Sequence, residues 1–211
     1  MASAAGAVRF RAATAADVDA AVPLIHSAGP AAFDYVFAVA ARGGAQAFLR
    51  RAFLDGAGQF GWRQHVVGEV GGQVVAVGTG YGGEASLAYT LIAARLILAH
   101  YGPRHAPGVI ARGLRTERVI PPPPRGVHYL AHLGVAAERR GQGIGRALIE
   151  QLIARGRALG RTRLMLDVAV SNPRAQALYA RLGFRVTQER RSRLANAAGA
   201  VPGHRRMERA P

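Results

Sequence analysis

One stretch of this sequence constrains the fold more than any other. The mostly apolar residues 130–135 lead into a glycine-rich loop, Arg140-Gly-Gln-Gly-Ile-Gly145, which opens directly into an amphipathic helix. Glycines permit a sharp turn and a close approach to a ligand, because they lack a Cβ atom. Free backbone N–H groups and the positive end of a helix dipole favour a phosphate at such a junction. On its own, the loop fits a phosphate site and an ordinary strand-to-helix turn equally well.

The residues after this loop predict alternating helices and strands. Leucines and isoleucines from Leu148 to Leu159 form one apolar helical stripe, and Gly160 fits the position just after the helix. Asn172-Pro173 is a typical helix start, and Gly183 is expected to end that helix. The strands expected around these helices are 127–135, 163–168, 184–187 and a last one near 205–209.

The first part of the chain predicts a short strand, several helices and a hairpin. Thr14 and Asp17 have the spacing of a capping box for a helix that ends at Ser27 and is kinked or broken at Pro23. The other expected elements are a strand at 8–11, helical turns at 33–37 and 45–54, and strands 65–70 and 73–77 joined by Gly71-Gly72.

Residues 78–83 match the dinucleotide-binding pattern G-x-G-x-x-G after a strand. A dinucleotide unit also needs a second parallel strand and an acidic residue about twenty positions further on. Neither is found here, so we interpret these glycines as the end of a strand and a flexible lead-in to the segment that follows.

Residues 82–126 are predicted to be an insertion that forms a lid over a functional site. A helix is expected at 86–101, followed by an irregular basic loop over 102–126 that contains Pro121-Pro-Pro-Pro124. A loop of this length in a compact domain is usually functional.

The charge of the chain raises nucleic acid as a partner, but the charge pattern argues against it. The 28 basic residues are all arginine, the formal net charge is +16, and the arginines are scattered along the chain without interleaved aromatic residues. A small polyanionic ligand is a simpler explanation of the positive charge.

We expect one domain over 1–211, with a weakly defined segment at 192–211 and a homodimer compatible with the sequence.

Cysteine is absent, and the N-terminus lacks a basic region followed by an apolar run. These features predict a cytoplasmic protein without disulfides and without a membrane span. The sequence predicts no metal site.

Two motifs together resemble those of the GCN5-related N-acetyltransferase (GNAT) superfamily. The family's acetyl-CoA loop has the form Gln/Arg-x-x-Gly-x-Gly/Ala, which Arg140 to Gly145 match. Its second element, Asn-x-x-Ala-x-x-Leu-Tyr-x-x-x-Gly-Phe, is matched by Asn172 to Phe184. The match is good over about 127–187, and residues 8–77 agree only in element order. The resemblance implies an α/β fold with a mixed, strongly bent sheet and flanking helices.

The resemblance also implies where coenzyme A binds. The glycine loop would hold the pyrophosphate through its backbone, and residues 133–135 would pair with the pantetheine arm as a neighbouring strand does, which requires the next strand to splay away. The N–H group of Val135 would polarise the thioester carbonyl. The residues expected to bind coenzyme A are Leu133, Gly134, Val135, Arg140, Gly141, Gln142, Gly143, Ile144, Gly145, Arg146, Asn172 and Tyr179.

Catalysis needs an acid and a base. Tyr179 is the candidate general acid that returns a proton to the leaving thiolate. The candidates for the base are His132, His128, Tyr129 and Glu84. Strand alternation predicts that Tyr129 and Ala131 share one face, opposite His128 and His132. Relatives often have an acid or histidine where this chain has Tyr129 or Ala131.

These observations predict an N-acetyltransferase that moves an acetyl group from acetyl-CoA to a small-molecule or peptide amine by direct attack in a ternary complex. Two alternatives are a coenzyme-A-binding sensor without efficient catalysis and a nucleic-acid binder driven by net charge.

Overall fold

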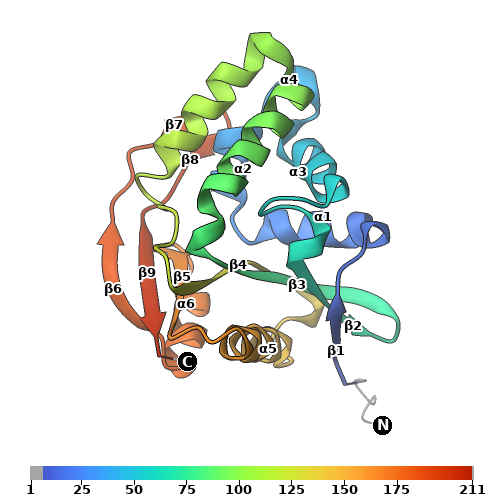
Figure 1. The fold of residues 1–211 in the computed structure, drawn as a ribbon, viewed down its shortest axis with the longest axis vertical. Coiled ribbons are helices and arrows are strands. Elements are labelled where there is room, and N and C mark those ends of the chain that lie inside the picture. Colours follow the sequence, from blue (N-terminus) through green and yellow to red (C-terminus); the bar gives the residue numbers. More distant parts are fainter. Residues whose placement is uncertain (1–6, 211) are drawn as a thin grey trace.

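A seven-stranded mixed sheet forms the centre of the fold, in the order β1-β2-β3-β4-β5-β9-β6 (Figure 1). The computed structural model describes residues 7–210. The strands are β1 (Arg9–Ala12), β2 (His65–Val70), β3 (Gln73–Gly82), β4 (Val127–Val135), β5 (Arg163–Ala169), β6 (Arg185–Arg190) and β9 (His204–Arg209). Among the described strands, β4 and β5 are the parallel pair and the other neighbours are antiparallel. The expected mixed sheet is confirmed, and its last strand lies between β5 and β6.

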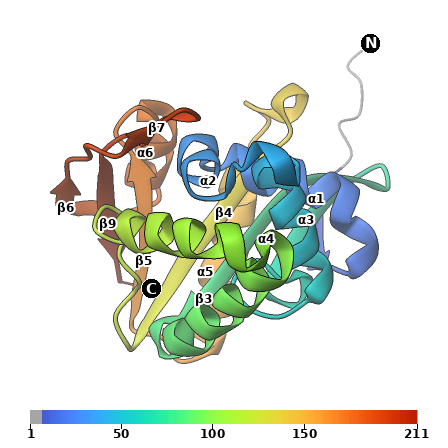
Figure 2. The same cartoon turned by 90° about the horizontal axis from the view of Figure 1, so that it is seen from above.

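Helices cover both faces of the sheet (Figures 1 and 2). They are α1 (Val18–Ser27), α2 (Pro30–Phe37), α3 (Gly44–Asp55), α4 (Ser86–Thr116), α5 (Ile144–Ala158) and α6 (Pro173–Arg181). The first four share one apolar core with Val67 and Val77 of the sheet, and α5 and α6 share a second core with Leu130 and Leu166. Within residues 7–210, no helix is long and apolar enough to cross a membrane.

Strand β3 contains the second strand of the expected hairpin and the glycines of the rejected dinucleotide pattern. Gly71 and Gly72, with φ values of 58° and 79°, form the turn between β2 and β3, a conformation that favours glycine. The strand β3 then continues through the glycines of residues 78–82. A Cβ atom at Gly80 would lie 2.3 Å from Nε2 of His128, so this glycine makes room for a side chain and not for a phosphate.

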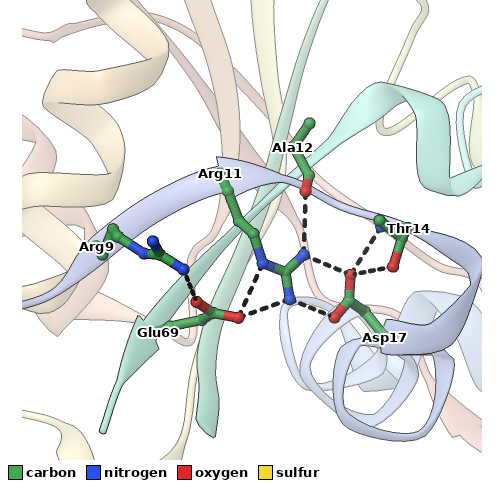
Figure 3. A network of polar contacts seen from close by, with 6 residues as sticks. All are labelled: Arg9, Arg11, Ala12, Thr14, Asp17 and Glu69. Atoms are coloured by element: carbon green, nitrogen blue, oxygen red, sulfur yellow. Dashed lines mark hydrogen bonds and ion pairs between the residues drawn. The ribbon is translucent and has the colours of Figure 1, made fainter. Parts of the chain in front are cut away.

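An arginine network fastens the first strand to the first helical segment (Figure 3). The Arg11 guanidinium donates hydrogen bonds to both carboxylate oxygens of Asp17 at 2.8 and 2.7 Å and to Glu69 at 2.8 Å. Asp17 also accepts from the backbone N–H of Thr14, which is the expected capping box. The hydrogen bonds from Arg11 hold the pKa values of Asp17 and Glu69 below their usual range. The helix that follows, α1, continues through Pro23 without the expected break.

The prediction of an irregular loop over residues 102–126 is wrong for the first half of that range. The chain is non-helical only at Gly102, where φ is 70°, and a second helical part of α4 then continues to Thr116. Pro103 begins that part, where its missing N–H group costs nothing. The burial of Ala106 and Val109 supports the helix. The loop is therefore confined to residues 117–126.

The C-terminal segment is better defined than the sequence suggested. After β6, a short hairpin precedes β9; its strands are β7 (Ala195–Asn196) and β8 (Gly199–Ala200), with two residues each. The Asn196 amide donates a hydrogen bond of 3.0 Å to the carbonyl of Tyr35 in α2. The segment is thereby held against the helical layer on the α4 side of the sheet.

Candidate functional site

The central parallel strands separate halfway along their length. Pairing between β4 and β5 covers residues 127–129 and 163–165 and ends at Tyr129 and Met165. Beyond that point β5 remains paired with β9, whereas the facing edge of β4 from Leu130 to Val135 has no partner strand among the described residues. The separation leaves an open strand edge at the centre of the sheet.

The direction of one N–H group on this edge follows from the hydrogen bonds that the other edge of β4 forms with β3. Ala136 donates its N–H to the carbonyl of Val75 at 2.8 Å, and Val135 lies opposite Ala76 in the same register. Antiparallel strands alternate hydrogen-bonded and non-hydrogen-bonded pairs. The N–H group of Val135 therefore points away from β3 and toward the separation.

The glycine loop presents a row of unpaired backbone donors. Gly141 and Gly143 have φ values of 79° and 82°, and α5 begins at Ile144 without a side-chain cap. The first hydrogen bond of the helix runs from the N–H of Ala147 to the carbonyl of Gly143 at 3.0 Å. Within the described part of the chain, the N–H groups from Gly141 to Arg146 have no partner. Successive free N–H groups at a helix N-terminus suit a phosphate.

Side chains of the loop hold it against the end of β4. The Arg140 guanidinium donates to the carbonyl of Val135 at 3.1 Å, and the Gln142 amide donates to the carbonyl of Glu138 at 3.3 Å. A Cβ atom on Gly145 would lie 3.6 Å from Val135 and 3.7 Å from Leu178. The start of α5 thus packs against both the end of β4 and the helix α6.

The helix α6 begins as predicted and carries a buried tyrosine. The side-chain oxygen of Asn172 accepts from the N–H of Ala175 at 3.1 Å, so it acts as an N-cap. The ring of Tyr179 packs edge-on against Phe184, and 8% of the residue is exposed. Burial raises the pKa of the Tyr179 phenol to about 12, so it remains protonated at neutral pH.

A bulge in β4 reverses the predicted orientation of His132. In the register with β3, Ala131 pairs with Thr79 and Gly134 pairs with Val77, which leaves one extra residue in β4. His132 has a φ of 55° at this bulge. Its ring packs against Phe33 and Phe60 of the α1–α4 side, whereas His128 lies against Gly156 of α5. The prediction that the two histidines share a face is therefore wrong.

A second histidine, which the sequence did not indicate, orients His132. Nδ1 of His65 lies 2.9 Å from the carbonyl of Gly61, so this nitrogen donates its proton. Nε2 of His65 lies 3.1 Å from Nδ1 of His132 and then accepts. In this arrangement Nδ1 of His132 carries the proton and Nε2 holds a free lone pair. Burial, and then the neighbouring His65, hold the pKa of His132 well below its usual range, so the ring is neutral.

His132 lines a cavity of about 330 Å³ between the sheet and the helices α2 and α4. Phe33, Phe60, Tyr81 and Tyr89 also line it, together with the loop after α4. The cavity lies on the same side of the sheet as the reoriented His132. Its aromatic side chains come from segments that are far apart in the sequence.

The other three candidates for the base have different roles. Tyr129 lines the cavity, but burial and the nearby Asp167 raise the pKa of its phenol well above its usual range, and it donates to Asp167 at 2.9 Å. Glu84 accepts from the N–H of Gly126 and from Arg161, which lowers its carboxyl pKa to about 2. His128 is fully buried under α5 and does not line the cavity.

Comparison with known proteins gives one family. The family model described as the acetyltransferase (GNAT) family matches residues 45–184. A curated relative, the "5-NmdU N-acetyltransferase" of Pseudomonas phage PaMx11, is 45% identical over 60 residues. That alignment covers 28% of this chain and 41% of the phage protein, so the chain matches less than half the length of this relative.

Solved structures share the fold at low sequence identity. An N-acetyltransferase from Staphylococcus aureus Mu50 is 15% identical with a TM-score of 0.69, over 95% of this chain and all of that chain (100%). A phosphinothricin acetyltransferase from Sinorhizobium meliloti, determined in complex with AcCoA, is 18% identical with a TM-score of 0.57, over 96% of this chain and 88% of that chain. These likenesses establish the fold.

Proposed function

This chain belongs to the acetyltransferase (GNAT) family, and we propose that it transfers an acetyl group from acetyl-CoA to an amine of a small molecule or peptide. One observation carries the proposal: the free N–H groups from Gly141 to Arg146 lie at the end of a strand whose edge is open. This combination provides a phosphate site and a strand-like partner for an amide-containing arm. An ordinary strand-to-helix turn needs neither.

The donor would be held mainly by backbone groups. The loop N–H groups bind the pyrophosphate of coenzyme A, and the open edge at Leu133, Gly134 and Val135 pairs with its pantetheine amides. The outward N–H of Val135 stabilises negative charge that develops on the thioester oxygen. The amide nitrogen of Asn172 is available for the same arm, because the N-cap uses only the oxygen. When bound, acetyl-CoA supplies a thioester whose carbon is attacked by the amine and whose sulfur leaves as thiolate.

His132 is the general base of the proposed reaction. An amine must lose its proton to become a nucleophile, and the free lone pair at Nε2 of His132 accepts that proton. The hydrogen bond to His65 holds the tautomer in which this nitrogen is available. The aromatic contacts with Phe33 and Phe60 fix the plane of the ring. A neutral imidazole is ready to act at pH 7 without prior deprotonation.

Tyr179 is the general acid. Its phenol is protonated at neutral pH, as any tyrosine is, and burial raises its pKa further, to about 12. The hydroxyl has no hydrogen-bond partner among the described residues, so its proton is available to the leaving sulfur. The position of α6 against the start of α5 and the end of β4 supports this assignment.

The experiment measures acetyl-CoA binding and acetyl-CoA consumption separately, with a panel of amines that includes 5-NmdU, the acceptor named for the phage relative. The proposal expects consumption with at least one amine. It also expects that His132→Gln lowers consumption without changing the affinity for acetyl-CoA, and that Tyr179→Phe lowers consumption as well. If acetyl-CoA binds but no amine is acetylated, the chain is a coenzyme-A sensor instead.

The homodimer stays a prediction. Exposed leucines on α4, namely Leu87, Leu91 and Leu98, form an apolar stripe at helical spacing that is available for such an interface. Analytical ultracentrifugation of the wild type and a Leu91→Glu variant tests it, because a charge in the stripe is expected to weaken a dimer formed there.

A further inference from the structure

Glu117 is an unpaired acid in a chain with a large excess of arginine. The formal net charge is +16, and every other acidic residue except Glu138 forms an ion pair with an arginine or histidine in the described structure. Glu117 forms no ion pair or side-chain hydrogen bond there. With so many arginines available, an acid that lines a cavity and has no partner is exceptional in this molecule.

The position of Glu117 separates it from the other unpaired acid. Glu138 is exposed in the loop between β4 and α5, whereas Glu117 follows α4 directly, is partly buried and lines the same cavity as His132. Burial raises the pKa of the Glu117 carboxyl, and no neighbouring cation counteracts this. The loss of hydration is therefore uncompensated in the protein alone.

The rest of the cavity favours a ligand that has an apolar body and a positively charged group. None of the described residues that line it is an arginine, although arginine is abundant elsewhere. The other acid of the lining, Asp167, already accepts from Tyr129 at 2.9 Å and from Arg206 at 2.8 Å. Aromatic rings such as Phe33 and Tyr89 supply the walls, and aromatic faces attract cations.

We infer that Glu117 is the counter-ion for a cationic group of the acceptor, and that the acceptor is an aromatic or otherwise apolar amine. The inference rests on the proposed function, since it names the substrate class of that site. Glu117 is a specificity-determining residue in this account: it selects the cationic ligand, and His132 takes up the proton. An anionic acceptor is disfavoured because the cavity offers it no guanidinium.

The test measures binding of two probes of the same shape to the protein without acetyl-CoA by isothermal titration calorimetry. The probes are 2-phenylethylamine, which is cationic at pH 7, and the neutral 2-phenylethanol. We expect the wild type to bind the amine at least about tenfold more tightly than the alcohol, as a charge-assisted hydrogen bond provides. The variant Glu117→Gln loses this preference and keeps its affinity for the alcohol. The matched control Glu138→Gln, at the other unpaired acid, retains the preference.

Three results would overturn the inference: equal affinities of the two probes for the wild type, an unchanged preference in Glu117→Gln, or no binding of either probe at millimolar concentration. A separate titration with acetyl-CoA alone distinguishes this failure from failure of the proposed function. If acetyl-CoA binds and is consumed while the probes are not discriminated, only the role of Glu117 is wrong. If the probes are discriminated while acetyl-CoA does not bind, the acetyl transfer is wrong and the cation site stands.

Discussion

The two halves of the proposed site are built in different ways. On the donor side, the free N–H groups of residues 141–146 and the open edge of β4 offer backbone atoms from one continuous stretch of chain. On the acceptor side, the cavity is formed by side chains from α2, α4, β4 and the loop after α4, which meet only in the folded protein. The two sides join at β4.

This difference explains what each half can recognise. Backbone donors at fixed spacing bind a constant ligand, and their sequence signal is glycine at positions of positive φ. Side chains in a cavity can be exchanged without altering the strand or the loop. The acceptor can therefore differ between proteins that share the donor site, and its identity has to be inferred from individual residues such as His132 and Glu117.

The largest effect is expected from a change at His132, which should lower activity on the acceptor side and leave the donor side unchanged. The variant His132→Gln retains a similar shape but cannot take up a proton, so we expect kcat to fall by about 10²–10⁴-fold, as for loss of a general base. The affinity for acetyl-CoA, measured by titration calorimetry, should stay within about twofold because His132 belongs to the acceptor side. A kcat near that of the wild type would mean that another group, or water, accepts the proton.

The next effect changes only the donor side. At Gly143, where φ is 82°, a valine is strained by about 1–3 kcal/mol, and we expect Gly143→Val to weaken acetyl-CoA binding by about 10–100-fold. Gly160 has a φ of 66° just after the other end of α5, so Gly160→Val is a control for backbone strain alone. Equal loss of acetyl-CoA affinity in both variants would refute the role of the loop.

A smaller effect is expected from the residue that positions His132. In His65→Phe the ring stacking remains but the acceptor for Nδ1 of His132 is lost, and we expect kcat to fall about tenfold, within the range of a hydrogen bond. The variant His65→Gln places an oxygen near the former Nε2 and should recover most of the activity. Loss of activity in both variants, with unchanged thermal stability, would indicate another role for His65.

The smallest effect on the site is expected from the arginine network of Figure 3, which belongs to neither half. The variant Arg11→Gln should leave kcat and acetyl-CoA affinity unchanged and lower the free energy of unfolding by about 2 kcal/mol, because the buried Asp17 loses its charged partner.

The same network predicts a pH dependence. The folded pKa of Asp17 lies below its value in the unfolded chain, so its stabilising contribution is complete above about pH 4 and is lost as the pH falls through the folded pKa. Urea unfolding between pH 7 and pH 2.5 should show a steeper loss in the wild type than in Arg11→Gln. Parallel curves would mean that Arg11 does not lower this pKa.

The sequence predicts the loop and the helices of the proposed donor side well, because their signals are local. The start of α6 at Asn172-Pro173, the end of α5 before Gly160 and the glycine loop follow from neighbouring residues. The orientation of His132 could not be predicted, since the bulge depends on how β3 and β4 pair. His65 is separated from His132 by 67 positions, and no local pattern connects them.

The loop predicted over residues 102–126 differs from the structure for a physical reason of the same kind. Gly102 and Pro103 indicate a helix end, which is correct, but Pro103 also begins a second helical segment. The stability of that segment comes from burial of Ala106 and Val109 against distant parts of the chain. Glu117 lies just beyond it, so its place in the cavity depends on a tertiary contact that the sequence does not reveal.

The central claim is that acetyl-CoA binds to the backbone of the glycine loop and the open edge of β4. The most direct measurement is the change in backbone amide signals, observed by ¹H–¹⁵N NMR, when acetyl-CoA is added to the wild type. The account predicts the largest changes at the amides of residues 141–146 and at Val135. Saturable binding that leaves the amides of residues 141–146 unchanged would contradict it.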